Sequence, residues 1–132
     1  MAPELADPED AKLPVGPSDG TRLADPEDAK LLVLARAHRA RAGAAEAAAV
    51  RDTDGRTYSA ADVALPSLRL SALELAVALA ASSGVAGLEA ALVVGDCGIK
   101  AADVTVVREF AGAGVPIYRA DISGQIAQSA TT

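Results

Sequence analysis

Side chains that could carry out chemistry are few in this chain. Its 132 residues include one histidine, His38, and one cysteine, Cys97. A zinc site made of imidazole and thiolate ligands needs three of them, so one chain cannot supply such a site. A single cysteine also excludes an internal disulfide. We therefore expect neither a bound metal nor another cofactor.

Both residues have a structural alternative to a catalytic role. His38 stands among the arginines of an expected helix, where a packing or helix-end role is favoured over that of a general base. A cysteine nucleophile needs a pKa lowered by an imidazole, a cation or a helix N-terminus. Lys100 is close to Cys97 in the sequence, but a buried or half-buried thiol without a catalytic role is the favoured interpretation.

Three further patterns also favour structure over catalysis. Asp52 and Asp54 flank an expected hairpin turn, where aspartate stabilises the turn itself. Together with Asp62 they could otherwise suggest a site for a hard cation. The spacing of the glycines fits no phosphate-binding loop, and the serines lack the acid–base partners of a hydrolase triad. These glycines and serines are Gly84, Gly87, Gly95, Gly98, Ser59, Ser67 and Ser71.

The elements that must position these side chains are those of a small α/β domain. Residues 103–111 fit a strand or a helix. Ser71 and Glu74 have the spacing of a capping box, so the second helix could begin at Ser71 rather than at Leu68. Pro116 implies an edge position for the last strand. The expected helices are 26–41 and 68–82, the expected strands are 46–52, 56–63, 88–94 and 115–119, and an Asp-Gly hairpin turn lies at 53–55.

A nine-residue repeat marks the N-terminal part. Leu-Ala-Asp-Pro-Glu-Asp-Ala-Lys-Leu occupies residues 5–13 and again 23–31. Both copies have an Asp-Pro helix start, but prolines soon after the first copy stop its helix. We expect an acidic N-terminal arm over 1–22, a domain over 23–127 and a C-terminal tail over 128–132. An interaction motif presented twice is the alternative for the repeat.

Charge and hydropathy exclude several classes of partner. The net charge is −6; residues 1–30 contain eight acidic and three basic residues, and residues 31–132 contain ten and nine. Without a basic cluster, nucleic-acid binding is not expected. No apolar run approaches the roughly 20 residues of a membrane span, and the N-terminus lacks a signal-peptide pattern. We therefore expect a cytoplasmic protein that does not bind membranes.

The order of the elements, with an Asp-Gly hairpin and a buried second helix, resembles the cytidine deaminase fold. Residues 48–58 resemble the family's first hairpin, and residues 70–77 resemble its helix that begins Cys-Ala-Glu-Arg-x-Ala. Residues 92–94 and 108–110 are similar to its central strand and to the end of its next helix. The resemblance covers about residues 28–121. It implies a three-layer α/β fold, with an N-terminal hairpin and helices on both faces of the sheet.

At the positions that carry the family's chemistry, the sequence departs from the pattern. The resemblance places the first zinc ligand at Ser71 and the proton-transferring glutamate at Leu73. Glu74 follows one residue later, about 100° around the helix, and would point elsewhere. The family's Pro-Cys-x-x-Cys motif is matched only around Cys97, with Lys100 at the second cysteine. The resemblance therefore implies a domain without the zinc ligands and catalytic glutamate.

Nucleoside recognition is also in doubt, because the family's Asn-Val-Glu reads Asp62-Val-Ala64 here. We expect a catalytically inactive cytidine-deaminase-like domain with a structural, regulatory or protein-interaction role and an unidentified protein partner. Family members commonly assemble around the second helix, and the apolar surface of that helix here predicts a homo-oligomer, a dimer or tetramer. The alternatives are a sensor that binds a nucleoside or base without turnover and, less favoured, an active zinc-dependent cytidine deaminase.

Overall fold

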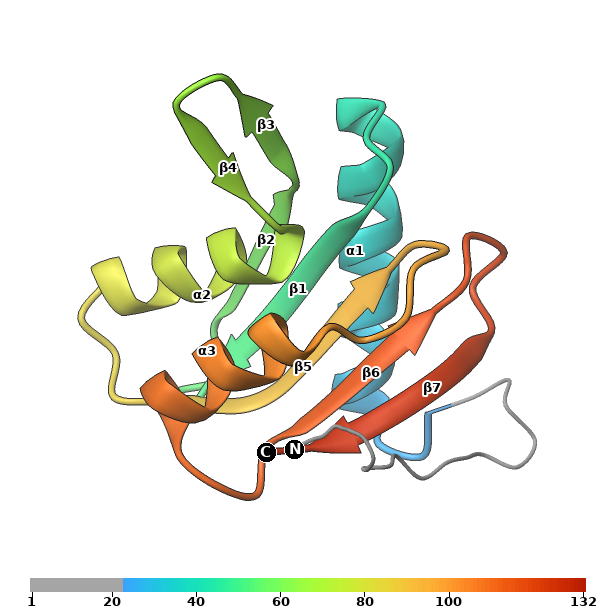
Figure 1. The fold of residues 1–132 in the computed structure, drawn as a ribbon. Helices are drawn as coiled ribbons and strands as arrows, with labels where there is room; N and C mark the ends of the chain where they lie inside the picture. Colours follow the sequence, from blue (N-terminus) through green and yellow to red (C-terminus); the bar gives the residue numbers. More distant parts are fainter. Residues whose placement is uncertain (1–22) are drawn as a thin grey trace.

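Small aliphatic side chains build the central strands, which lets helices approach the sheet closely on both faces. The structure, a computed structural model, describes residues 23–132. Its five-stranded sheet has the order β2-β1-β5-β6-β7 (Figure 1). Neighbouring strands are antiparallel except for the parallel pair β5–β6. The strands are β1 (Ala47–Asp52), β2 (Thr57–Ala61), β5 (Leu88–Val94), β6 (Pro116–Ala120) and β7 (Ile126–Thr131).

In the part of the chain that the structure describes, three helices cover the sheet. Helix α1 (Pro26–Ala42) lies on one face, and α2 (Ala72–Ser82) and α3 (Ala101–Ala111) lie on the other (Figure 1). Asp25 caps α1 by accepting a hydrogen bond from the Glu27 amide at 2.8 Å, and Gly43 ends it at φ +63°. The arrangement confirms the expected three-layer α/β fold with helices on both faces.

Alternate residues of β1, β5 and β6 pack into two separate cores on opposite faces of the sheet, as the pleat of a strand requires. The cluster on the α2 face includes Val50, Leu73 and Ile117, and the cluster on the α1 face includes Leu31 and Leu92. All five of these side chains are fully buried. Within residues 23–132, no helix is both long and apolar enough to cross a membrane.

Two boundaries around the second helix differ from expectation. The helix does not begin at Leu68, because residues 68–70 form strand β4 (Leu68–Leu70), which pairs with β3 (Val63–Leu65) as a separate hairpin. Pro66 lies in the turn of this hairpin, which the sequence pattern did not predict. The alternative start is confirmed: Ser71 is the N-cap of α2, and its capping box with Glu74 is complete.

The C-terminal part also differs from expectation. Residues 103–111, which fitted either element, belong to helix α3. The edge position predicted from Pro116 is wrong, because β7 pairs with the outer side of β6. Pro116 is tolerated as the first residue of its strand, where the pairing with β5 has not yet begun. Residues 128–131, expected in a tail, lie in β7. The expected arm, 1–22, lies outside the described residues.

Candidate functional site

Ser71 and Leu73, the residues that the resemblance places at the metal-ligand and proton-transfer positions, lie at the start of α2. Ser71 Oγ accepts a hydrogen bond from the Glu74 amide at 3.0 Å and donates one to Asp103 Oδ1 at 2.7 Å. Leu73 points into the α2-face core and is fully buried. Glu74, as expected, points elsewhere: its Oε1 accepts from the Ser71 amide at 2.8 Å. The start of the helix is thus held by its own capping groups.

Glu46, just before β1, reaches the same helix start. Its Oε2 accepts a hydrogen bond from the Ala72 amide at 3.0 Å, and its Oε1 accepts one from Lys100 Nζ at 3.1 Å. Glu46 is buried, whereas the Lys100 side chain is 44% exposed. Gly95 leaves room for this arrangement, since a Cβ there would lie only 3.0 Å from Glu46 Cβ. The sequence pattern assigned no role to Glu46 or Asp103, because neither belongs to a recognisable motif.

Electrostatics favour a protonated lysine at this site. Burial opposes the charge on Lys100, but the hydrogen bond and negative charge of Glu46, with a contribution from Asp103, outweigh it and raise the lysine pKa. Burial also raises the pKa of Asp103, although the Ser71 hydroxyl and the Lys100 ammonium both favour its carboxylate form. The cluster therefore combines a firmly protonated cation with a carboxyl group that is costly to ionise.

This donor set does not fit the zinc ion that the family resemblance implies. A protonated ammonium has no lone pair for a metal, and the Ser71 hydroxyl already donates its proton to Asp103. Cys97 would be the only thiolate. In the described part of the chain, no group of three or more His, Cys, Asp or Glu side chains is arranged to hold a metal ion.

A cleft of about 370 Å³ opens beside the cluster. Asp62 lines it, and Asp62 Oδ1 accepts a hydrogen bond from the Glu46 amide at 3.3 Å. Ala64, the other position compared with the family's sugar-binding pattern, does not line the cleft; it is exposed on β3. The expectation of a buried or half-buried Cys97 is wrong, because the loop between β5 and α3 presents this thiol at the surface. The lining residues are Arg39, Ala45, Glu46, Asp62, Asp96, Cys97 and Lys100.

The remaining candidates have structural partners. His38 Nδ1 lies 2.7 Å from Ser59 Oγ, a contact that joins α1 to β2. Among the described residues no carboxylate hydrogen-bonds to His38, so the pair is not part of a triad. Asp52 accepts hydrogen bonds from the amides of Asp54 and Arg56 at 2.8 and 3.0 Å, which confirms its role in the hairpin turn.

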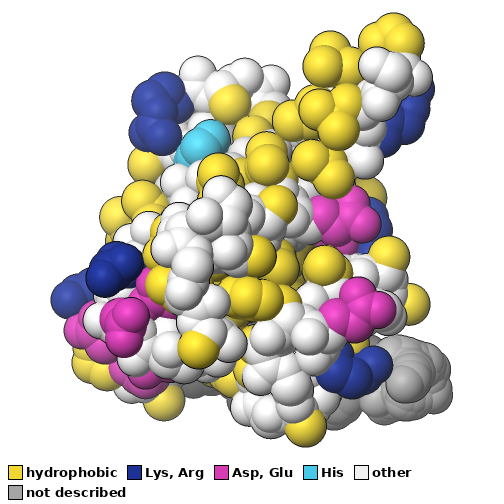
Figure 2. Space-filling view, turned by 90° about the vertical axis from the view of Figure 1, so that its left-hand side faces the viewer, with side chains coloured by type: hydrophobic (Ala, Val, Ile, Leu, Met, Phe, Trp, Pro, Cys, Tyr) yellow, Lys and Arg dark blue, Asp and Glu magenta, His cyan; other side chains and the backbone are white. Residues whose placement is uncertain are grey.

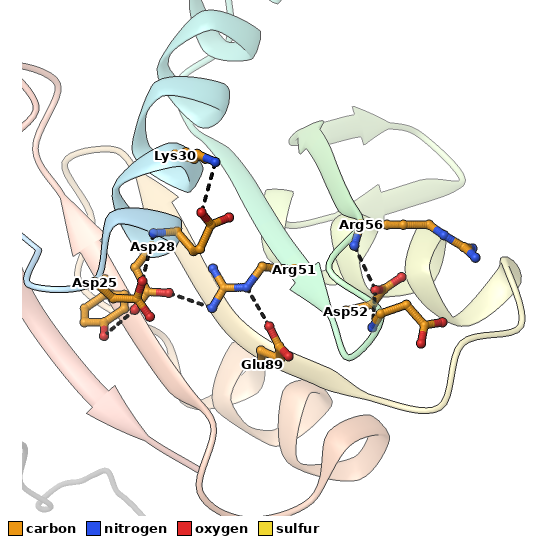
Figure 3. A network of polar contacts seen from close by, with 10 residues as sticks. Asp25, Asp28, Lys30, Arg51, Asp52, Arg56 and Glu89 are labelled. Carbon is orange, nitrogen blue, oxygen red and sulfur yellow. Dashed lines mark hydrogen bonds and ion pairs between the residues drawn. The ribbon is translucent and has the colours of Figure 1, made fainter.

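A buried ion-pair network on the other face of the sheet was also missed by the sequence patterns. Arg51 donates from Nη2 to Asp28 Oδ1 at 2.9 Å and from Nε to Glu89 Oε1 at 2.7 Å (Figure 3). Tyr118 donates its hydroxyl proton to Asp28 Oδ2 at 3.0 Å. These contacts join the first turns of α1 to β1, β5 and β6. An arginine within a strand of small apolar residues was the only signal for them in the sequence.

Comparison with known proteins identifies the fold and the family. Three similar solved structures are cytidine deaminases. That from Burkholderia pseudomallei has 20% identity and a TM-score of 0.68, with 77% of this chain and 90% of that chain covered. That from Mycobacterium leprae has 22% identity and a TM-score of 0.63, with 81% and 94% covered. A mutant enzyme from Mycobacterium tuberculosis has 24% identity and a TM-score of 0.54, with 64% and 82% covered.

At these identities, the likeness establishes the fold alone. A search of curated proteins found no match. The family model described as "Cytidine deaminase-like" matches residues 24–124, which is most of the chain. The chain therefore belongs to the cytidine deaminase-like family.

Proposed function

We propose that this domain does not catalyse deamination and instead acts as a structural or regulatory module that contacts other protein chains. The observation that carries the proposal is the polar cluster at the start of α2. There Ser71 and Lys100, which the family resemblance places at metal-ligand positions, are bonded to Asp103 and Glu46.

Zinc-dependent deamination needs a metal-activated water and a carboxylate that moves protons. Leu73, at the position of that carboxylate, cannot carry a proton. The neighbouring carboxylates have other partners: Glu46 binds the Ala72 amide and Lys100, and Glu74 binds the Ser71 amide. Each is engaged in holding the fold, which supports a structural role for the cluster.

A protein-contact role is supported by apolar side chains on the β3–β4 hairpin and on α2. Leu65 and Leu68 are 53% and 48% exposed on the hairpin, and Leu79 is 40% exposed on α2. The hairpin projects from the body, and Figure 2 shows hydrophobic side chains gathered on it. A two-stranded hairpin is marginally stable in isolation. Contact with a second copy of the chain would cover these side chains, and we propose a dimer or tetramer on this basis.

The catalytic part is tested with purified protein, added Zn²⁺ and a cytidine absorbance assay. We expect zinc far below one ion per chain, no turnover, and an unfolding temperature that a chelator does not change. Cys97→Ser is the control, because it removes the one thiolate that this chain could offer to zinc but leaves any turnover from a contaminating enzyme. Stoichiometric zinc with turnover that Cys97→Ser abolishes would overturn the proposal.

The assembly part is tested by sedimentation of the wild type and of a Leu65→Ser/Leu68→Ser double variant. We expect the wild type to sediment as an oligomer and the double variant to dissociate while it remains folded. Val33→Ser is a matched control, because Val33 is 69% exposed on α1, across the sheet from α2. A wild type that remains monomeric over a wide concentration range would contradict the homo-oligomer.

The cleft beside the cluster supports a second candidate function, a sensor for a nucleoside or base. Its volume of about 370 Å³ lies within the range of small-molecule sites. A ligand at 100 times its Kd adds about 2.7 kcal/mol of stability, which a thermal-shift screen detects. Asp62→Ala should remove a shift that comes from the cleft. A screen in which no nucleoside or base raises the unfolding temperature would eliminate this candidate.

A further inference from the structure

The sequence that forms the beginning of α1 occurs twice in the chain. Residues 23–31 are identical to residues 5–13 at all nine positions. In the second copy, Leu31 is fully buried and Asp28 is 5% exposed. Asp25 caps the helix, and Leu23 packs against the same α1-face core as Leu31. The buried side chains of these first turns, Asp28 and Leu31, therefore both lie inside the repeated sequence.

The site that receives this sequence consists of groups outside the repeat. Arg51 donates a hydrogen bond to one oxygen of Asp28, as Figure 3 shows, and Tyr118 donates one to the other oxygen. The α1-face core receives Leu31. Arg51 is itself buried, so it requires a carboxylate at that place. The site therefore recognises an aspartate and a leucine three residues apart at the start of a helix. The first copy carries the same pair as Asp10 and Leu13.

We propose that residues 5–13 are an alternative occupant of this site within the same chain. In the exchanged arrangement, Asp10 takes the place of Asp28 and Leu13 takes the place of Leu31. Residues 14–31 then form a loop, and the remainder of α1 from Leu32 onward keeps its position. Pro14 follows Leu13 directly, and proline ends a helix without loss where no further turn is needed. The first copy thus carries in its sequence the same side chains that the site holds in the second copy.

In the wild type the second copy occupies the site, because it continues directly into the rest of α1. That continuation places Ala35 in the core and keeps the backbone hydrogen bonds of the helix unbroken. Exchange breaks the helix after the site and closes an 18-residue loop. The entropic cost of closing a loop grows only slowly with its length. The first copy also belongs to the same chain as the site, which keeps it at a high effective concentration there. A destabilising substitution in the second copy alone should therefore shift the equilibrium toward the arrangement in which the first copy occupies the site.

The first test is a double-mutant cycle on thermal unfolding of the full chain, with Leu13→Ala and Leu31→Ala. In the wild-type background Leu13→Ala should leave the unfolding temperature unchanged. In the Leu31→Ala background, Leu13→Ala should lower the unfolding temperature by at least about 4 °C, because Leu13 can then no longer replace the missing Leu31 side chain. Val15→Ala, just outside the repeat, should have no effect in either background. An effect of Leu13→Ala that is equal in the two backgrounds, or absent from both, would overturn the proposal.

The milder Leu31→Val replaces Leu31→Ala if the latter does not fold. A second measurement uses limited trypsin digestion, since Lys12 and Lys30 occupy equivalent positions in the two copies. Leu31→Ala should slow cleavage after Lys12 relative to the wild type, and Leu13→Ala should reverse this protection. Simple loosening of α1 would speed cleavage after Lys30 but would not protect Lys12. Unchanged cleavage at Lys12, or protection that depends on protein concentration, would contradict exchange within one chain.

Discussion

Lys100 Nζ lies 3.1 Å from Glu46 Oε1, while the other oxygen of the same carboxylate holds the first amide of α2. Lys100 is also the N-cap residue of α3, and Glu46 immediately precedes β1. One carboxylate therefore fixes the relative positions of a strand and two helices. Removal of the Lys100 ammonium should therefore lower the free energy of unfolding of the whole domain.

Lys100→Met should destabilise the domain by about 1–2 kcal/mol, because it leaves the buried Glu46 carboxylate without its cation; solvent exposure of the lysine limits the effect. Urea unfolding measures the loss. Lys30→Met is the matched control, because its pair with Glu27 is exposed, and it should cost less than about 0.5 kcal/mol. Since the folded state raises the Lys100 pKa, the stabilisation should persist through neutral pH and vanish as pH rises well above 10.5. Equal losses for both lysines would contradict the role of the cluster.

Asp103→Asn should be tolerated at neutral pH, with a change within about 1 kcal/mol, because the amide oxygen can still accept the Ser71 hydroxyl proton. Burial raises the pKa of Asp103, so the folded wild type binds a proton more tightly than the unfolded chain. Wild-type stability from this group therefore falls as pH rises from the ordinary value of 3.8 through the raised one. The variant lacks this fall, and its stability relative to the wild type should rise over that range. A relative stability that decreases instead would show that the ionised form is favoured.

Ser71→Ala should destabilise the domain by about 1–3 kcal/mol, since it removes a helix cap and leaves Asp103 without its hydroxyl donor. The comparison variant is Ser83→Ala, at the other end of α2, where an exposed hydroxyl donates only to the Leu79 carbonyl. That variant should change the free energy of unfolding by less than about 0.5 kcal/mol. Circular dichroism of both variants during denaturation gives the two values, and similar losses would show that Ser71 does no more than an exposed serine.

Tyr118→Phe should reduce the loss of folding stability that the wild type shows as pH rises into the alkaline range. Burial, followed by the hydrogen bond to Asp28, raises the pKa of Tyr118 to about 12. The folded state therefore retains the phenolic proton after the unfolded chain has lost it, and stability falls as pH rises from about 10 to about 12. The phenylalanine variant should show a smaller fall over this interval in unfolding experiments. Absorbance titration of the wild type at 295 nm should reveal a late-titrating tyrosine that is missing in the variant.

Local features of the fold were predictable from residues that are close in sequence. Asp25 and Pro26 mark the start of α1, Gly43 marks its end, and the Asp-Gly pair at 54–55 marks the first hairpin. Ser71 and Glu74 mark the true start of α2. Each signal works because a cap or a turn is decided by backbone hydrogen bonds within about four residues. The count of one histidine and one cysteine likewise constrained the chemistry without any structure.

The sequence alone determined the class of fold, the caps and turns, and the scarcity of soft metal ligands. Only the tertiary structure decided which side chains meet: Lys100 and Glu46 are 54 residues apart, and Ser71 and Asp103 are 32 apart. It also decided that β7, not the strand of Pro116, forms the edge of the sheet. The physical reason is that strand order and crossovers bring distant residues together, and no periodicity within a single segment encodes that choice.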